Sequence, residues 1–418
     1  MMGSMARAAR ACMLLACMSL LAARVHASGD ALTLSEALQA TLARNPELVA
    51  TEFSLTEARE RVTQAGLRPN PEASLELENF AGSGDARDTQ SLEITLALSQ
   101  VIELGGKRQA RVQLAEADHD VAAIDKQARQ LDALAETTRR FIDAAAAERR
   151  RDYARQASSL AREMRDAIAR RVQAARSPVA EGSRAAGALI RAEIELAQAE
   201  SEARAARYLL ASSWGEAEPQ FGGLAADLFR FDPGESFPSW FARIERNPAV
   251  LRFASAARLR GAELRLAEAQ ARPNLTVSLG VRRFEASGDN ALVASAAMPL
   301  AFRDRNQGAI AAARARVSQV EAERVAELNR LRASLFAIHQ EMETARMRAT
   351  RLRADALPAA RQALDQTLAG YERGRFSFLD LASAQAELLE IERAALEAAA
   401  DHHRLRTELE RLTGEATS

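Results

Sequence analysis

Four segments of about ten residues alternate between apolar and polar side chains. In the first segment, Leu75 and Leu77 face one side while Glu76 and Glu78 face the other. A period of two residues predicts β-strands, and the turn-rich residues between the members of each pair predict two hairpins. We expect the strands at about 72–80, 90–99, 274–284 and 291–300.

Most of the remaining chain has the composition and spacing of long helices. Neither proline nor glycine occurs from Lys107 to about Arg176, and a helix of about 70 residues is about 105 Å long. The matching run from Asn306 to about Arg373 keeps the pattern despite Pro358 and two glycines. Apolar residues in both runs are sparse and mixed with alanine and charge, which favours side-by-side coiled-coil packing. Shorter helices are expected at 34–43, 46–67, 178–214 and 378–413.

The chain contains one structural unit twice, about 200 residues apart. The second copy repeats three motifs of the first, which are Arg44-Asn45-Pro46, Arg68-Pro69-Asn70 and Ser83-Gly84-Asp85, as Arg246-Asn247-Pro248, Arg272-Pro273-Asn274 and Ser287-Gly288-Asp289. A weaker echo links 171–177 to 371–377. Duplication of a unit this large predicts a pseudo-symmetric molecule. We expect a first repeat at 28–215, a linker at 216–235, a second repeat at 236–414 and a tail at 415–418.

The first residues have the pattern of an export signal. Arg7 and Arg10 precede the short apolar stretch 11–23, and small residues before Ser28 suit cleavage after Ala27. We therefore expect a signal peptide at 1–27 and an exported protein. The alternative is a lipoprotein signal that uses Cys17. Both cysteines lie inside this segment, so a chain cleaved after Ala27 would form no disulfide.

Composition and motifs exclude several classes of function. The formal net charge is −1, which gives no electrostatic reason to bind nucleic acid. The motifs of metalloproteases, nucleotide-binding loops, serine hydrolases and CxxC sites are missing from the sequence, so we expect neither an enzyme nor a cofactor. No later stretch offers about 20 continuous apolar residues, and no transmembrane helix is expected.

The histidines are scattered, and only His402-His403, beside Asp401, resembles a cluster. Adjacent helical residues do not face each other, which makes this pair a poor chelate. We expect these two histidines, like His119 and His339, to be surface or packing residues and not metal ligands.

Four strands cannot close a barrel, and open sheet edges are not tolerated in lipid. About ten residues is the length that a tilted strand needs to cross a hydrocarbon core. Three copies of the chain would supply twelve strands, and a barrel of that size encloses a lumen. We therefore expect a homotrimeric barrel in contact with outer membrane lipid, continued by a helical tube of about 100 Å. The alternative for one hairpin alone is a sheet of a soluble protein.

The order of the elements, with its duplication, resembles the TolC-like outer membrane efflux proteins over nearly the whole expected mature chain. Two junctions, Glu103-Leu104-Gly105-Gly106-Lys107-Arg108 and the segment 299–308, resemble the heavy-metal cation efflux branch that is similar to CzcC. The resemblance implies a mainly α fold with a small β part. It also implies a trimeric duct in the outer membrane of a Gram-negative bacterium, which docks on a periplasmic adaptor and an inner-membrane RND pump and exports heavy-metal cations.

Two other functions remain open at this point. The same duct would serve equally well for drugs, other small molecules or a secreted polypeptide. A structural or adaptor coiled-coil protein of the periplasm would explain the helices, but it would leave the four strands and the duplication unexplained.

Candidate working residues lie in the turns between the long and the returning helices. Gly374 can supply a positive φ, and Ser377 is a good N-cap for the following helix. Ser177 and Pro178 occupy the corresponding turn of the first repeat.

The resemblance implies that acidic residues just after the second turn ring the closed periplasmic tip and select cations, and Asp380 matches one of these positions. Ser383 stands where a second acid is often found. Tyr371 and Arg373 would hold the tip shut through bonds to the first turn, near residues 176–181, where Glu181 lies. The alternatives are a solvated acid at a helix N-terminus and an ordinary helix surface.

Overall fold

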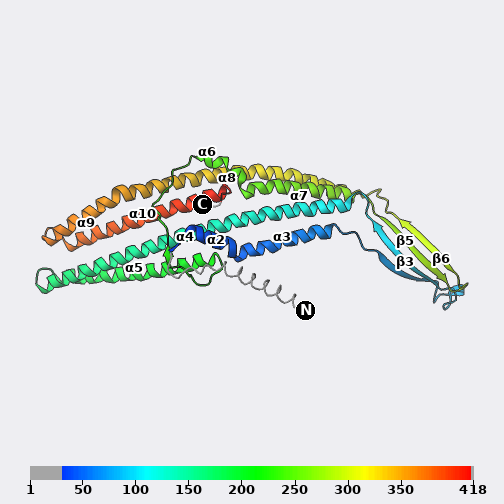
Figure 1. The fold of residues 1–418 in the computed structure, drawn as a ribbon, viewed down its shortest axis with the longest axis horizontal. Coiled ribbons are helices and arrows are strands. Elements are labelled where there is room, and N and C mark those ends of the chain that lie inside the picture. Colours follow the sequence, from blue (N-terminus) through cyan, green and yellow to red (C-terminus); the bar gives the residue numbers. More distant parts are fainter. Residues whose placement is uncertain (1–30, 416–418) are drawn as a thin grey trace, which may run out of the picture.

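The computed structural model describes residues 31–415. The expected signal peptide at 1–27, the lipidation alternative at Cys17 and the end of the tail at 416–418 lie outside these described residues. The chain forms a long bundle of helices with a small sheet at one end (Figure 1). This confirms the part of the predicted fold class that describes a mainly α chain with a small β part.

The elements follow the order expected from the duplication. The first half contains β1 (Ala31–Leu32), α2 (Leu34–Arg44), α3 (Pro46–Ala65), β2 (Glu72–Glu78), β3 (Glu93–Ile102), α4 (Lys107–Gln173) and α5 (Val179–Ser212). The second half contains β4 (Gly223–Leu224), α6 (Phe237–Ala242), α7 (Pro248–Gln270), β5 (Leu275–Phe284), β6 (Asn290–Ala297), α8 (Gln307–Arg351), a π-helical turn (Leu352–Ala356), α9 (Leu357–Glu372) and α10 (Phe378–Leu412).

The sheet has the order β2-β3-β5-β6, and all of its strands pair antiparallel. Each hairpin pairs its own two strands, and the β3–β5 pairing joins the two repeats. The register aligns four apolar residues in one row across the sheet, namely Leu75, Leu96, Val281 and Leu292. All four are exposed in the single chain. On the opposite face, Arg282 forms ion pairs with Glu78 and Glu93.

Three strands differ in their bounds from the sequence-based expectation, and the first of them, β2, ends at Glu78 instead of about residue 80. The strand expected from about residue 90 begins at Glu93 and extends to Ile102, because its pairing with β5 continues to Leu275. The last strand ends at Ala297 instead of about residue 300. Pro299 follows directly and has no N–H group for a sheet hydrogen bond, which is a reason for the earlier end.

The long helices of the two repeats are not equivalent. The α4 helix has 67 residues without interruption, whereas its counterpart contains the π-helical turn between α8 and α9. Pro358 lies in the first turn of α9. Because proline lacks an N–H group and its ring crowds the preceding turn, the wider π-helical turn accommodates it without ending the helix.

The duplicated Asn-Pro pair connects each returning helix to a short helix. The Oδ1 atom of Asn45 accepts hydrogen bonds at the start of α3, and its Nδ2 atom donates to the carbonyl of Ser213, 2.8 Å away, just after α5. Asn247 does the same between α7 and the carbonyl of Leu412 at the end of α10, at 2.7 Å. Each asparagine therefore caps two helix ends at once.

The core lies where the shorter helices meet the long ones, and it consists of small clusters instead of one large centre. One cluster includes Phe141, Leu210 and Trp214, and another includes Trp240 and Leu335. Within residues 31–415, no helix combines the length and the apolar character needed to cross a bilayer.

Candidate functional site

The second interhelical turn joins α9 to α10 through a left-handed residue. Gly374 has φ 72°, the conformation expected of it. The N–H of Arg375 donates to the carbonyl of Gly370 at 2.8 Å, and the N–H of Gly374 donates to the carbonyl of Tyr371 at 3.0 Å. These two bonds form a Schellman motif, which satisfies the last carbonyls of α9.

The first turn has the same hydrogen bonds but different residues. The left-handed position is Ala175, with φ 54°, and the N–H of Arg176 donates to the carbonyl of Arg171 at 2.8 Å. Ser177 does not cap α5 through its side chain. Its Oγ atom accepts a hydrogen bond from Nε of Arg171 at 3.2 Å, and Pro178 occupies the N-cap position. The offset of about 200 residues from Gly374 leads to Ala175 as the matching position. Alanine, however, gives no sequence signal for a positive φ.

Ser377 and Asp380 form a capping box at the start of α10. The Oγ atom of Ser377 accepts from the N–H of Asp380 at 3.2 Å, and Oδ2 of Asp380 accepts from the N–H of Ser377 at 2.8 Å. The hydrogen bonds from Ser377 lower the pKa of Asp380 below its usual range. Asp380 therefore stays ionised at neutral and mildly acidic pH, and its carboxylate is exposed at the tip of the molecule.

The two turns contact each other through Tyr371. Its hydroxyl lies 3.5 Å from Oε2 of Glu181, which makes a long hydrogen bond. The guanidinium of Arg171 lies 4.9 Å from the centre of the Tyr371 ring. Burial raises the pKa of Tyr371, and the nearby charge of Glu181 acts in the same direction. Beneath this contact, Ile168, Phe378 and other buried side chains form an apolar cluster.

The structure thus brings together Tyr371, Glu181 and the turn that contains Ser177. It adds Arg171, which the sequence pattern did not single out. Arg373 is exposed and forms no hydrogen bond or ion pair through its side chain within residues 31–415. A cavity of about 370 Å³ lies beside the Tyr371 ring, between the ends of α4 and α9.

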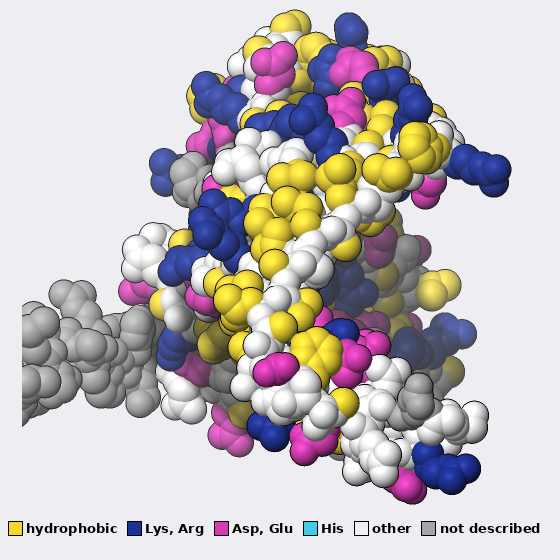
Figure 2. Space-filling view, turned by 90° about the vertical axis from the view of Figure 1, so that its right-hand side faces the viewer, with side chains coloured by type: hydrophobic (Ala, Val, Ile, Leu, Met, Phe, Trp, Pro, Cys, Tyr) yellow, Lys and Arg dark blue, Asp and Glu magenta, His cyan; other side chains and the backbone are white. Residues whose placement is uncertain are grey.

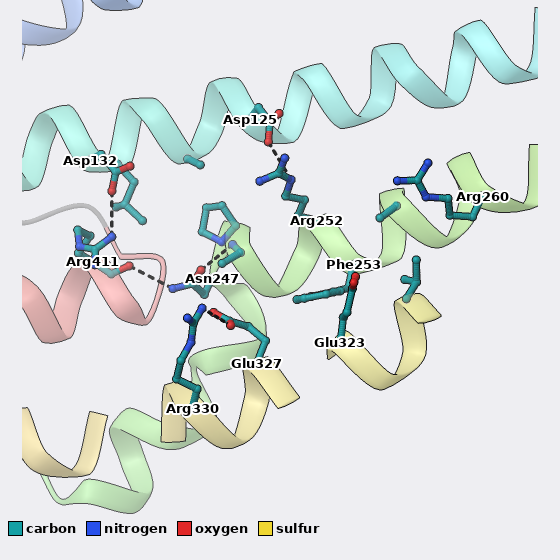
Figure 3. Close-up of a pocket in the computed structure, with 16 residues that line it drawn as sticks. Asp125, Asp132, Asn247, Arg252, Phe253, Arg260, Glu323, Glu327, Arg330 and Arg411 are labelled. Carbon is teal, nitrogen blue, oxygen red and sulfur yellow. Dashed lines mark hydrogen bonds and ion pairs between the residues drawn. The ribbon is translucent and has the colours of Figure 1, made fainter. Parts of the chain in front are cut away.

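A larger groove of about 550 Å³ lies between α4, α7, α8 and α10. Its charged residues are largely paired with one another (Figure 3). Arg252 contacts Asp125 at 3.3 Å, and Arg411 contacts Asp132 at 3.0 Å. Asn247 lies in the same groove, beside Arg411. Because charges of both signs are paired here, the groove offers no single ligand chemistry.

Two histidines of α10, His402 and His403, contact the linker segment 216–235. Nε2 of His403 lies 3.0 Å from the carbonyl of Leu228, and the Phe231 ring packs against both His402 and His403. Burial lowers the pKa of His402 to about 4, so this ring is neutral at physiological pH. Within the described part of the chain, no group of three or more His, Cys, Asp and Glu side chains is arranged to hold a metal ion.

Comparison with known proteins identifies relatives of this chain. A family model described as outer membrane efflux protein matches residues 37–216. The chain is 29% identical over 384 residues to the cobalt-zinc-cadmium resistance protein CzcC of Cupriavidus metallidurans, which covers 92% of this chain and 90% of that protein. It is 23% identical over 285 residues to the nickel-cobalt-cadmium resistance protein NccC of Alcaligenes xylosoxydans xylosoxydans, covering 68% of this chain and 64% of that protein.

Solved structures share the fold. A membrane protein from Pseudomonas aeruginosa superimposes with a TM-score of 0.76 at 21% identity, covering 92% of this chain and 90% of that chain. The open state of the MtrE outer membrane channel of Neisseria gonorrhoeae has a TM-score of 0.73 at 17% identity. The match covers 92% of this chain and 89% of that chain.

Proposed function

Because a family model of outer membrane efflux proteins matches residues 37–216 and the chain is similar to CzcC over 92% of its length, we propose that it is the exit duct of a tripartite RND-type efflux system that exports heavy-metal cations. In this system, a homotrimer of the chain spans the outer membrane. Its periplasmic end docks on an adaptor protein, which connects it to an inner-membrane RND pump.

The observation that carries this proposal is the four-stranded sheet with an exposed apolar face. The outer strands, β2 and β6, each pair on one side only within residues 31–415. The apolar row is exposed, with Leu75 at 66% and Leu292 at 79%. A membrane would cover this face, and neighbouring copies would complete the hydrogen bonds of both edges. Three copies would form a twelve-stranded barrel with a lumen.

The helices supply the second part of the duct. The 67 residues of α4 correspond to a rod of about 100 Å. Helices with sparse apolar residues and many alanines suit close packing side by side, so the same three copies would form a tube below the barrel. The two turns at the end of this tube would then form its periplasmic tip.

Heavy-metal cations are the proposed cargo because of the similarity to CzcC over 92% of the chain. The best test is growth of a strain that lacks this protein. We expect sensitivity to salts of zinc, cobalt or cadmium, restored by the gene on a plasmid, with unchanged resistance to hydrophobic drugs. Sensitivity to the drugs alone would favour the duct with a different cargo. A freely soluble monomer that forms no pores in planar bilayers would exclude a duct altogether.

We also propose that Asp380 and the Tyr371–Glu181 contact form the gate at the periplasmic tip. Three symmetry-related copies of Asp380 would concentrate negative charge at the narrow end, attract cations and repel one another. The hydrogen bond between Tyr371 and Glu181 fastens the second turn to the first within each chain. Arg373 is free to contact a neighbouring copy in this arrangement.

Replacing Asp380 by alanine is expected to raise the conductance of purified trimers in planar bilayers and to weaken block by divalent cations. The physical reason is the loss of the charge ring. Asp380 also completes the capping box, so the matched control is Ser377→Ala, which breaks the box and keeps the carboxylate. If Ser377→Ala changes conductance and block as much as Asp380→Ala does, the helix cap and not the charge is responsible. Tyr371→Phe, measured in the same way, reports on the contact with Glu181.

A further inference from the structure

A loop of residues 298–306 joins β6 to α8 at the boundary between the sheet and the helices. Asn306 adopts a left-handed conformation with φ 58°. Its N–H donates to Oδ1 of Asp304 at 2.8 Å, and its Nδ2 atom donates to the carbonyl of Ala267 in α7, also at 2.8 Å. These bonds tie the end of the loop to the neighbouring helix.

The same loop presents large apolar side chains to the outside. Leu300 is 66% exposed and Phe302 is 76% exposed. The N–H of Phe302 donates to the carbonyl of Leu300 at 2.9 Å, which holds the two residues in a tight turn. Exposed apolar groups of this size on an ordered loop indicate that something else covers them.

A pocket of about 570 Å³ lies next to these side chains, and its charge is mainly positive. Lys107, Arg272 and Arg303 line it, together with Leu300 and Phe302. Arg272 and Arg303 form no ion pair within residues 31–415, unlike arginines of the helix bundle such as Arg404, which contacts three carboxylates. The one carboxylate in the pocket, Asp304, already accepts the N–H of Asn306.

We propose that this pocket binds an anionic phospholipid of the membrane. Arg272 and Arg303 would bind the headgroup phosphate through charge-assisted hydrogen bonds. Leu300 and Phe302 would contact the start of the acyl chains. This inference rests on the proposed function, which places the sheet in the outer membrane.

The chemistry beside the pocket favours a lipid as its occupant. The pocket adjoins the start of β5 and the end of β6, and both strands carry exposed apolar residues further along, such as Leu279 and Leu292. Figure 2, viewed from the sheet end, shows hydrophobic side chains gathered near the middle of this face, with basic and acidic side chains around them. Cations and an aromatic ring beside the apolar band of a membrane sheet match the chemistry at the boundary between headgroups and acyl chains.

The test is a fluorescence measurement on protein reconstituted into vesicles. The probe is Phe302→Trp, compared with the parent chain because Trp214 and Trp240 contribute a constant background from buried sites. The vesicles contain phosphatidylcholine and phosphatidylglycerol, and one of the two lipids carries brominated acyl chains. We expect stronger quenching when the phosphatidylglycerol is brominated. This preference should be lost when Arg272→Gln and Arg303→Gln are added, and inorganic phosphate should not compete.

Phe376→Trp is the matched control, because Phe376 is 48% exposed at the opposite end of the molecule and should not be quenched. Equal quenching by the two brominated lipids would overturn headgroup recognition. If the channels conduct but Trp at position 302 is not quenched, a neighbouring copy or water covers the loop. This result would overturn the lipid-binding inference and leave the proposed function standing. Vesicles without conductance and without quenching would overturn the proposed function as well.

Discussion

Replacing Asn247 by alanine is expected to destabilise the protein by about 1.5–5 kcal/mol. Asn247 is only 5% exposed. Its Oδ1 atom accepts the N–H of Ala249 at the start of α7, and its Nδ2 atom donates to the carbonyl of Leu412 at the end of α10. Alanine removes an N-cap, which costs about 0.5–2 kcal/mol. It also leaves a buried carbonyl without a partner, which costs about 1–3 kcal/mol.

The measurement is denaturant or thermal unfolding followed by the helical circular dichroism signal. The duplicated residue provides the control, because Asn45 makes the same two kinds of hydrogen bond at a half-buried position. Water can replace the lost bonds more easily there, so Asn45→Ala is expected to cost less. If Asn45→Ala destabilises the protein as much as Asn247→Ala, burial of the Leu412 carbonyl is not the reason for the effect.

Replacing Gly280 by valine is expected to abolish assembly of the proposed channel. Gly280 lies in β5 opposite Ala97 of β3. A Cβ atom at Gly280 would lie 2.6 Å from the carbonyl oxygen of Leu96 and 2.8 Å from Cβ of Ala97. Because the closest atom belongs to the backbone of the neighbouring strand, the clash can be relieved only by moving β3 away from β5. This pairing joins the two repeats, so its loss would open the sheet in the middle.

The measurement is the amount of heat-resistant oligomer in the membrane fraction. Ser278→Val is the matched control, because it lies on the same strand and the same face, opposite Ser99, and already has a Cβ atom. We expect Ser278→Val to keep the oligomer and Gly280→Val to lose it. A normal yield of heat-resistant oligomer from Gly280→Val would show that the β3–β5 pairing tolerates a side chain at this point.

Much of the candidate site followed from local sequence signals. Gly374 adopts the expected positive φ, and Ser377 caps α10. Both are local effects, because a turn depends on the residues within it. The partner of Asp380 in the capping box and the role of Arg171 were not predicted. The ring contact of Arg171 joins residues about 200 positions apart, and no local pattern reports it.

The sequence by itself determined which of the longer segments are helices and strands, their approximate bounds, and that several motifs occur twice. These properties depend on periodicity, on the position of proline and glycine, and on repeated motifs, all of which act over a few residues. Only the tertiary structure decided which strands meet, with Ala97 opposite Gly280, and that Asn247 and His403 each bridge distant elements. Such contacts depend on packing between segments far apart in the chain, and the pattern of one segment does not specify its partner.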